Sequence, residues 1–359
     1  MDTQVDLSDL PVDASAPVLV TGATGYVAGW IVKGLLDAGV TVHAAVRDPR
    51  NTGKVRHLLD AADASPGKLR LFQSDLLRDG SYAEAMQGCR IVIHTASPFV
   101  RSVEDAQRDL VDPAVRGTRN VLGTANETGS VERVVLTSSF AAMIGDAEDL
   151  LKVPGRIVTE ETWNTTSSLT REPYSYSKTL AEKEAWLMAG AQDRWRLVVI
   201  NPGLVIGPAL NADPTSESFT IAKQMASGQM RMGAPRIALT VVDVREVAYA
   251  HLAAAFLPDA QGRHLLAAES TDVVDLGRRL LPAYGSRYAL PRRALPKALA
   301  VALAPAAGLE RGFLRRNIGF DLRGDTAKSR HALGVRYRPA QQSMEDMFDQ
   351  LVQSGTLNR

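Results

Sequence analysis

The sequence predicts an α/β protein in which a doubly wound parallel sheet is followed by a smaller C-terminal lobe. Two observations support this class. Short, almost purely apolar runs alternate with longer segments of helical periodicity between residues 18 and 200, and the first run leads directly into a glycine-rich turn. The chain has 359 residues, which is long for one minimal domain and leaves room for a second lobe.

Six apolar runs are predicted to be parallel strands that helices cover on both faces. They are residues 18–20, 40–46, 69–72, 91–93, 134–136 and 195–200. The predicted helices lie around residues 30–36, 55–62, 82–87, 109–126 and 174–188. Glycine and proline interrupt this pattern often beyond Pro202. We therefore expect a tail over 1–16, a sheet domain over 17–202 and a lobe over 203–359, from which 237–256 returns to the sheet domain.

Composition excludes several classes of partner and site. Lys and Arg number 41 against 40 Asp and Glu, so the net charge gives no reason to expect nucleic acid or an anionic membrane as partner. The single cysteine, Cys89, excludes an intramolecular disulfide and indicates a cytoplasmic protein. The six histidines lack metal-ligand spacing, so no metal is expected. Residues 1–17 lack the apolar core of a signal peptide, and the longest apolar stretch, 298–309, is shorter than the about 20 residues that a membrane span needs.

The first predicted strand ends in a glycine cluster, Thr21-Gly22-Ala23-Thr24-Gly25-Tyr26-Val27-Ala28-Gly29. Glycines in such a turn let the backbone approach a pyrophosphate, whose charge faces the free N–H groups of the following helix. The spacing Gly22-x-x-Gly25-x-x-Ala28 is tighter than the usual Rossmann pattern, and an ordinary strand-to-helix turn is the alternative. Its place between the first strand and the first helix favours a Rossmann dinucleotide site.

The residue at the end of the second strand distinguishes NADP from NAD. An NAD site usually has Asp or Glu there, which binds the ribose 2′-hydroxyl. This chain has Arg47 at that point and Lys54 shortly after it. A guanidinium can bind a 2′-phosphate through two hydrogen bonds. The alternative interpretation of Arg47 is an ordinary surface arginine. NADP is therefore the predicted cofactor of the sheet domain.

Tyr174 and Lys178 are four residues apart at the start of a predicted helix, so they share one face of it. An ammonium beside a phenol favours the phenolate, as proton transfer to and from the phenol requires. Ser139 follows the fifth strand, whose carboxyl end would line the ligand crevice, and its hydroxyl could hydrogen-bond a substrate oxygen. Taken alone, each signal could also be an incidental pair or plain turn chemistry, but together they occur in the chain order that a catalytic trio requires.

The chain resembles the extended short-chain dehydrogenase/reductases, and within them the branch of dihydroflavonol 4-reductase, cinnamoyl-CoA reductase and related aldehyde and ketone reductases. The resemblance runs from about residue 17 into the C-terminal region and is thin between Gly262 and Gly324. Besides the glycine cluster, the motifs that carry it are Val46-Arg47-Asp48-Pro49, Val55-Arg56-His57-Leu58-Leu59, His94-Thr95-Ala96-Ser97-Pro98, Pro113-Ala114-Val115-Arg116-Gly117-Thr118, residues 174–186 and Asn201-Pro202-Gly203-Leu204-Val205-Ile206-Gly207-Pro208.

The resemblance implies a Rossmann-type fold and a set of NADP contacts. The residues expected to contact the pyrophosphate are Gly22, Thr24, Gly25, Tyr26 and Val27. Arg47 and Lys54 are expected to bind the 2′-phosphate, and Asp75 and Leu76 to border the adenine. The residues expected to lie along the rest of the dinucleotide, up to its nicotinamide end, are Thr95, Ala96, Ser97, Tyr174, Lys178, Pro202, Gly203, Leu204, Val205 and Ser218. The chain departs from many relatives in one respect, because residues 113–115 hold no asparagine for a proton relay.

These observations predict an NADPH-dependent carbonyl reductase that uses Ser139, Tyr174 and Lys178. The alternatives are a nucleotide-sugar epimerase or dehydratase, which Arg47 suits poorly, and a non-catalytic NADP-binding regulator. Residues 140–143, 163, 225–232 and 284–314 are expected to shape a pocket for a largely apolar carbonyl substrate. The basic segment 278–316 could bind an anion or a CoA thioester, or it could be a solvated face.

Overall fold

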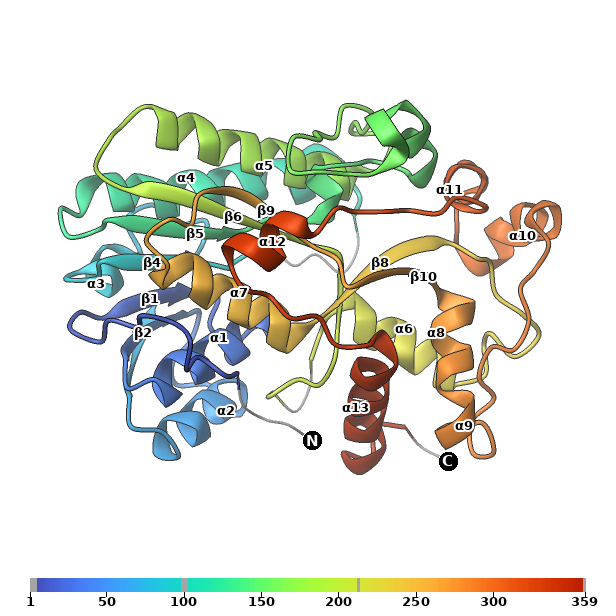
Figure 1. Cartoon of the computed structure of the whole chain (residues 1–359), viewed down its shortest axis with the longest axis horizontal. Helices are drawn as coiled ribbons and strands as arrows, with labels where there is room; N and C mark the ends of the chain where they lie inside the picture. Colours follow the sequence, from blue (N-terminus) through green and yellow to red (C-terminus); the bar gives the residue numbers. More distant parts are fainter. Residues whose placement is uncertain (1–4, 98–102, 212–213, 358–359) are drawn as a thin grey trace.

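The main sheet has seven parallel strands in the order β3-β2-β1-β4-β5-β6-β9 (Figure 1). A computed structural model describes residues 5–97, 103–211 and 214–357. The strands are β1 Val18–Thr21, β2 Thr41–Val46, β3 Lys68–Gln73, β4 Ile91–His94, β5 Arg133–Thr137, β6 Arg196–Pro202 and β9 Gly262–Leu266. The doubly wound sheet and its six predicted strands are confirmed. The seventh strand, β9, was not predicted, since Arg263 and His264 interrupt its apolar pattern.

The strand order reverses between β1 and β4. From β1 the chain builds the sheet outward through β2 and β3, then crosses back so that β4 pairs with the other edge of β1. In open parallel sheets, ligands bind at the carboxyl ends of the strands beside such a reversal. The glycine cluster follows β1 directly, so it lies at this place.

Helices cover both faces of the main sheet (Figure 1). On one face lie α1 Tyr26–Asp37, α2 Thr52–Asp63 and α7 Val244–Phe256, and on the other lie α3 Ala83–Met86, α4 Asp112–Glu127 and α5 Pro173–Gly190. Strand residues alternate between the two cores, as in β6, where Val198 and Ile200 join the first and Leu197 and Val199 the second. Both faces are buried, which explains why the strands read as continuous apolar runs.

A smaller three-stranded sheet organises the second part of the chain. Its order is β10-β8-β7, with β7 Leu204–Ile206, β8 Ala238–Asp243 and β10 Glu269–Asp272. The helices α6 Glu217–Ala226, α8 Val273–Arg279, α9 Leu281–Tyr284 and α13 Ala340–Gln353 contribute to its core, in which Phe219 and Phe348 are fully buried. The helices α10 Lys297–Leu303 and α11 Arg311–Asn317 lie at the far end of the molecule (Figure 1), and α12 Ala327–Ala332 packs near β9.

Between β5 and α5 the chain forms three short 3₁₀ turns, Phe140–Ala142, Ala147–Lys152 and Pro154–Arg156. Their apolar side chains form a separate core with Leu265 and Leu322. Across the described ranges, none of the helices combines the length and apolarity that crossing a bilayer would require.

Candidate active site

The glycine cluster forms a tight turn between β1 and α1. Gly22 has a left-handed backbone, with φ of +64°, and its carbonyl accepts a hydrogen bond of 2.9 Å from the Gly25 N–H group. Helix α1 begins at Tyr26 without a side-chain cap, so the N–H groups of its first turn remain available. Free N–H groups and the positive end of a 12-residue helix suit the pyrophosphate that the sequence predicts here.

The end of β4 packs directly against this turn. The Thr95 hydroxyl donates to the Thr21 carbonyl at 2.5 Å, and the Ala96 N–H group donates to the Thr21 hydroxyl at 3.1 Å. A Cβ atom on Gly22 would lie 2.9 Å from the Ala96 Cα, closer than real Cβ atoms approach backbone. Glycine is thus required at position 22 both by its backbone conformation and by its neighbour.

An alanine in the left-handed conformation costs about 1–2 kcal/mol. We therefore expect Gly22→Ala to lower the free energy of unfolding by at least this amount. It should also weaken NADPH binding, because Ala96 must shift. Urea denaturation and a fluorescence titration with NADPH measure the two effects. Gly123→Ala is the control, since this glycine lies within α4 with open space around its Cβ position. Unchanged stability and affinity in Gly22→Ala would contradict the assignment of the turn.

Two side chains of α1 join the glycine turn to the segment after β7. The Tyr26 hydroxyl donates to the Gly207 carbonyl at 2.6 Å, and the Trp30 indole N–H donates to the Pro208 carbonyl at 2.8 Å. Burial, followed by the charge of Asp243, raises the pKa of Tyr26 well above its ordinary value. The side chain of Tyr26 is thus a link to the smaller sheet, and its backbone N–H is the group that remains for a phosphate.

Arg47 and Lys54 are both exposed, one at the end of β2 and the other in the first turn of α2. Within the described parts of the chain, neither side chain has a hydrogen bond or an ion pair; Asp48 pairs with Arg50 instead, at 3.6 Å. Burial and then the charge of Asp75 raise the pKa of Tyr82, whereas the Arg47 guanidinium opposes this rise. Arg47 and Asp75 therefore lie around the same buried phenol, and two cations remain available for a phosphate.

The loop that holds Asp75 and Leu76 is fixed by Asn120 of α4. The Asn120 amide donates to the carbonyls of Leu76 at 3.0 Å and Arg78 at 2.9 Å, and its oxygen accepts from the Gly80 N–H group at 3.1 Å. Leu76 packs on Gly117, where a Cβ would lie 2.5 Å from the Leu76 Cγ. Asn120 was not predicted from the sequence, because the loop that it fixes lies 40 or more positions away in the chain.

Tyr174 and Lys178 lie in the first turns of α5. Pro173 begins the helix, after Glu172 in a left-handed conformation with φ of 50°. Tyr174 is 52% exposed, and the Lys178 Nζ lies 5.7 Å from the centre of its ring. The same Nζ donates to the Ser97 hydroxyl at 2.9 Å. The structure thus brings Tyr174, Lys178 and Ser97 together.

His94, at the end of β4, lies close to Lys178. Burial, followed by the Lys178 charge, lowers the pKa of His94 to about 3, and its Nδ1 shares a hydrogen bond of 2.8 Å with the Thr21 hydroxyl. The imidazole is therefore neutral at neutral pH and packs inside the sheet. The hydrogen bond from the Lys178 Nζ to Ser97 places the ammonium beside the carboxyl end of β4.

Ser139 follows β5 and begins the 3₁₀ turn Phe140–Ala142. Its hydroxyl oxygen accepts from the Ala141 N–H group at 3.1 Å, which leaves the hydroxyl hydrogen available to a ligand. Its neighbour Ser138 is buried and donates to Glu182 at 2.5 Å. The Ser139 carbonyl accepts from the Asn201 amide at 3.2 Å. Neither Glu182 nor a side-chain role for Asn201 was predicted from the sequence, although Glu182 follows Tyr174 and Lys178 at four-residue spacing.

The residues from Pro202 onward that were predicted to contact the cofactor differ in burial and in hydrogen bonding. Pro202 is buried at the end of β6, and Gly203 donates from its N–H group to Leu266 at 2.9 Å. Leu204 and Val205 are partly buried in β7. Ser218 lies in α6, is buried, and shares a hydrogen bond of 2.9 Å with Ser216. Among the described residues its hydroxyl has no hydrogen bond to another predicted site residue. Pro98, part of a motif noted above, lies outside the described residues.

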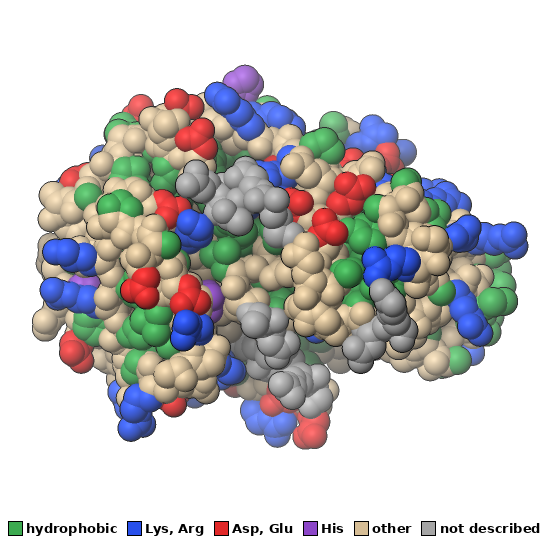
Figure 2. Space-filling model, turned by 90° about the horizontal axis from the view of Figure 1, so that it is seen from below, with side chains coloured by type: hydrophobic (Ala, Val, Ile, Leu, Met, Phe, Trp, Pro, Cys, Tyr) green, Lys and Arg blue, Asp and Glu red, His purple; other side chains and the backbone are tan. Residues whose placement is uncertain are grey.

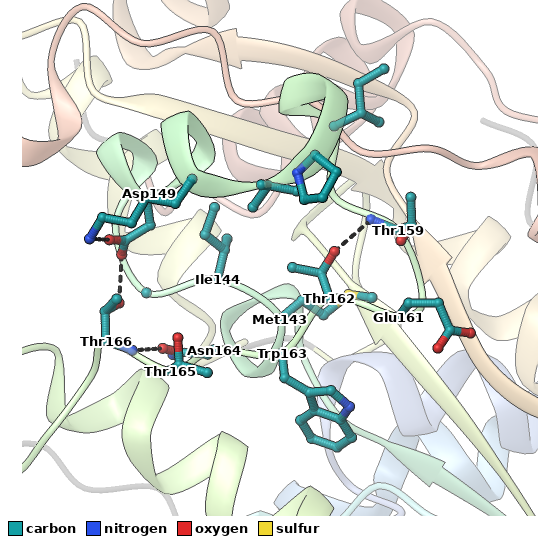
Figure 3. A pocket seen from close by; sticks show the side chains of 15 residues that line it. Met143, Ile144, Asp149, Thr159, Glu161, Thr162, Trp163, Asn164, Thr165 and Thr166 are labelled. Carbon is teal, nitrogen blue, oxygen red and sulfur yellow. Dashed lines mark hydrogen bonds and ion pairs between the residues drawn. The ribbon is translucent and has the colours of Figure 1, made fainter.

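A cavity of about 370 Å³ lies among the turns between β5 and α5 (Figure 3). Met143, Ile144 and Trp163 line it together with several threonines, and Asp149 and Glu161 contribute carboxylates. Of the residues expected to shape a pocket, Met143 and Trp163 thus border this cavity. Tyr284 instead packs on Phe348 in the core around the smaller sheet.

Basic side chains predominate at the end of the molecule formed by α10 and α11, as seen from below (Figure 2). Some of the arginines in segment 278–316 have structural partners: Arg279 pairs with Glu269 at 2.5 Å, and Arg316 pairs with the buried Asp146 at 2.7 Å. The remaining arginines of the segment are spread along its surface. This arrangement is closer to a solvated face than to one anion site.

The chain matches one protein family model and is similar in sequence or structure to several reductases. Residues 18–267 match the model of the NAD dependent epimerase/dehydratase family. A cinnamoyl-CoA reductase of Medicago truncatula is 40% identical over 271 residues, covering 74% of this chain and 81% of that protein. The Gre2 protein of Candida albicans, solved in complex with NADPH, is 28% identical with a TM-score of 0.77 and covers 94% of this chain and 99% of its own. Yeast methylglyoxal/isovaleraldehyde reductase Gre2, complexed with NADPH, is 25% identical with a TM-score of 0.76, covering 95% and 99%.

Proposed function

Because this chain belongs to the NAD dependent epimerase/dehydratase family, we propose that it is a carbonyl reductase that converts an aldehyde or ketone to an alcohol with NADPH. Within the family it is an extended short-chain dehydrogenase/reductase of the branch that holds the dihydroflavonol 4-reductase-like and cinnamoyl-CoA reductase-like enzymes. It is an NADP-dependent oxidoreductase.

One observation carries the proposal. An exposed Tyr174 has the Lys178 ammonium 5.7 Å from its ring, and the same ammonium is bound to Ser97 beside the glycine turn. A phenol that is partly solvated, next to a cation and beside a dinucleotide site is suited to proton transfer.

Each residue is proposed to have a separate task. Bound NADPH supplies the hydride that the carbonyl carbon accepts. The Ser139 hydroxyl donates a hydrogen bond to the carbonyl oxygen and stabilises the negative charge that develops there. The Tyr174 hydroxyl gives its proton to that oxygen, while Lys178 keeps the phenol in place and stabilises the phenolate that remains.

The residues around the glycine turn fit NADPH. Gly22 leaves a space that a Cβ would fill, the first turn of α1 offers free N–H groups, and Arg47 and Lys54 are exposed cations for a 2′-phosphate. Asp75 and Leu76 would border the adenine on the loop that Asn120 holds. Pro202 to Val205 would lie at the nicotinamide, and Ser218 is proposed only as a neighbour of that end.

The proposed substrate is a small, largely apolar carbonyl compound. The relatives named as methylglyoxal/isovaleraldehyde reductase and as cinnamoyl-CoA reductase support this class, and so does the apolar character of Phe140 and Met143 after Ser139. The single cysteine, Cys89, supports the cytoplasmic location that we propose with it.

The deciding experiment is a panel of aldehydes, α-diketones, keto esters and CoA thioesters, each assayed with NADPH and NADH in parallel. We expect stoichiometric NADPH oxidation with at least one aldehyde or ketone and much slower oxidation of NADH. Turnover of a nucleotide sugar without net consumption of cofactor would identify an epimerase or dehydratase instead. Tight NADPH binding with no turnover across the panel would favour a regulator.

A further inference from the structure

Glu182 is a fully buried carboxylate within the helix that carries Tyr174 and Lys178. Its side chain has no exposed surface, and it lies four residues after Lys178, on the same face of α5. The tasks proposed above for the reacting residues do not use it. A carboxylate that is removed from water must be matched by hydrogen bonds and opposite charge.

Glu182 receives hydrogen bonds from residues in or directly after three adjacent strands. The Ser138 hydroxyl after β5 donates at 2.5 Å, the Asn201 amide in β6 at 2.7 Å, and the Arg263 guanidinium in β9 at 2.6 Å. The Trp186 indole N–H, one turn further along α5, donates at 3.3 Å. Both carboxylate oxygens are therefore bound, and the helix is attached to three adjacent strands at one point.

The same network holds the backbone of Ser139. The Asn201 amide group that donates to Glu182 also donates to the Ser139 carbonyl at 3.2 Å. Ser138, bound to Glu182, directly precedes Ser139 in the chain. One carboxylate thus connects the helix of Tyr174 and Lys178 with the residue proposed to bind the substrate oxygen.

Arg263 extends the network to the turns between β5 and α5. Its guanidinium donates to the carbonyls of Glu160 and Thr162, and it stacks 4.0 Å from the centre of the Trp163 ring. Trp163 and Thr162 border the cavity of Figure 3. The wall of that cavity and the proposed catalytic groups therefore share one buried ion pair.

We propose that Glu182 is a positioning residue, which sets the distance and rotation of Tyr174 and Lys178 relative to Ser139. This inference rests on the proposed function. An apolar pair could stabilise the fold as well as a buried ion pair does, whereas bonds to three adjacent strands restrict α5 to one position. A displacement of about 1 Å at a reacting group can reduce the rate about 100-fold.

The test compares Glu182→Gln with Glu184→Gln. Glu184 lies on the same helix and pairs with Arg119 at 2.7 Å on the surface, so its variant also removes one carboxylate and one ion pair. We expect kcat for carbonyl reduction to fall about 10- to 100-fold in Glu182→Gln, while the Kd for NADPH changes less than about 3-fold. Glu184→Gln should stay within about 2-fold of the parent protein. Equal kcat values in the two variants would overturn the proposal.

Two further variants keep the test decisive if Glu182→Gln does not fold. Ser138→Ala removes one donor and leaves Arg263 paired, and the double variant Glu182→Gln/Arg263→Gln avoids an unpaired buried cation. Each is expected to lower kcat at least about 3-fold at temperatures well below its own unfolding transition. If a folded Ser138→Ala protein and a folded double variant both keep full kcat, Glu182 has only a structural role.

A measurement without turnover separates this inference from the proposed function. In the cofactor-free protein, hydrogen–deuterium exchange of 138–142 and 173–178 should rise together in Glu182→Gln and in Ser138→Ala, but not in Glu184→Gln. If the parent protein reduces no carbonyl compound, the proposed function fails, while coupled exchange would still support the positioning role. Unchanged exchange at 138–142 would contradict that role whatever the protein reduces.

Discussion

Tyr174→Phe is expected to lower kcat for carbonyl reduction by about 10²–10⁴-fold, the usual contribution of a positioned acid. The variant lacks only the hydroxyl that transfers the proton, and the hydroxyl has no hydrogen bond with another described residue that its loss would break. The Kd for NADPH should therefore change little. Steady-state kinetics with NADPH and the best substrate of the panel, together with a fluorescence titration, measure both quantities.

Tyr176→Phe is the matched control, because Tyr176 lies two residues further along α5 and thus on another face of the helix. It should retain kcat within about 2-fold. A Tyr174→Phe protein that keeps full turnover, or one that loses NADPH binding as strongly as turnover, would remove Tyr174 from the proposed chemistry.

Arg47→Ala is expected to raise the KM for NADPH about 10- to 150-fold and to leave the KM for NADH nearly unchanged. Hydrogen bonds between charged groups contribute about 1.5–3 kcal/mol each, and about 1.4 kcal/mol corresponds to a factor of ten in affinity. Arg47 has no carboxylate partner among the described residues, so its guanidinium is available to a phosphate without breaking an ion pair. Parallel kinetics with the two cofactors measure the change in preference.

Arg50→Ala is the control for Arg47→Ala, since Arg50 is an exposed arginine three residues away that pairs with Asp48. Its loss should alter neither KM by more than about 2-fold. Lys54→Ala should shift the preference in the same direction as Arg47→Ala but less, because an ammonium cannot form the paired hydrogen bonds of a guanidinium. An equal loss of NADPH and NADH affinity in Arg47→Ala would place the residue at another part of the dinucleotide.

Most of the main sheet could be predicted because its strands are buried on both faces. Val18 to Val20 and Val134 to Leu136 are apolar at every position, and helices separate them at regular spacing. Strand β9 lacks such an apolar run. Arg263 and His264 occupy its centre, and the residue that makes a buried Arg263 tolerable, Glu182, is 81 positions away in the chain. A strand that depends on such a distant partner has no local signature.

The residues of the candidate site also fall into those with a local sequence signal and those that depend on distant partners. Gly22, Tyr174 and Lys178 could be predicted because backbone conformation and helical spacing are local properties of the sequence. Asn120 could not, because its amide fixes a loop more than 40 positions away, and neither partner indicates the other. Asn201 is similar, since its bonds to Glu182 and Ser139 exist only after three strands have assembled.

The hydrogen bonds from Tyr26 to Gly207 and from Trp30 to Pro208 have a consequence for the order of binding. They begin in the first two turns of the helix whose N–H groups would hold the pyrophosphate, and they end where the chain leaves the smaller sheet. A pyrophosphate bound at this helix would therefore also steady the segment after β7, which follows directly on the residues proposed to lie at the nicotinamide end. We therefore expect the dinucleotide to bind before the carbonyl compound.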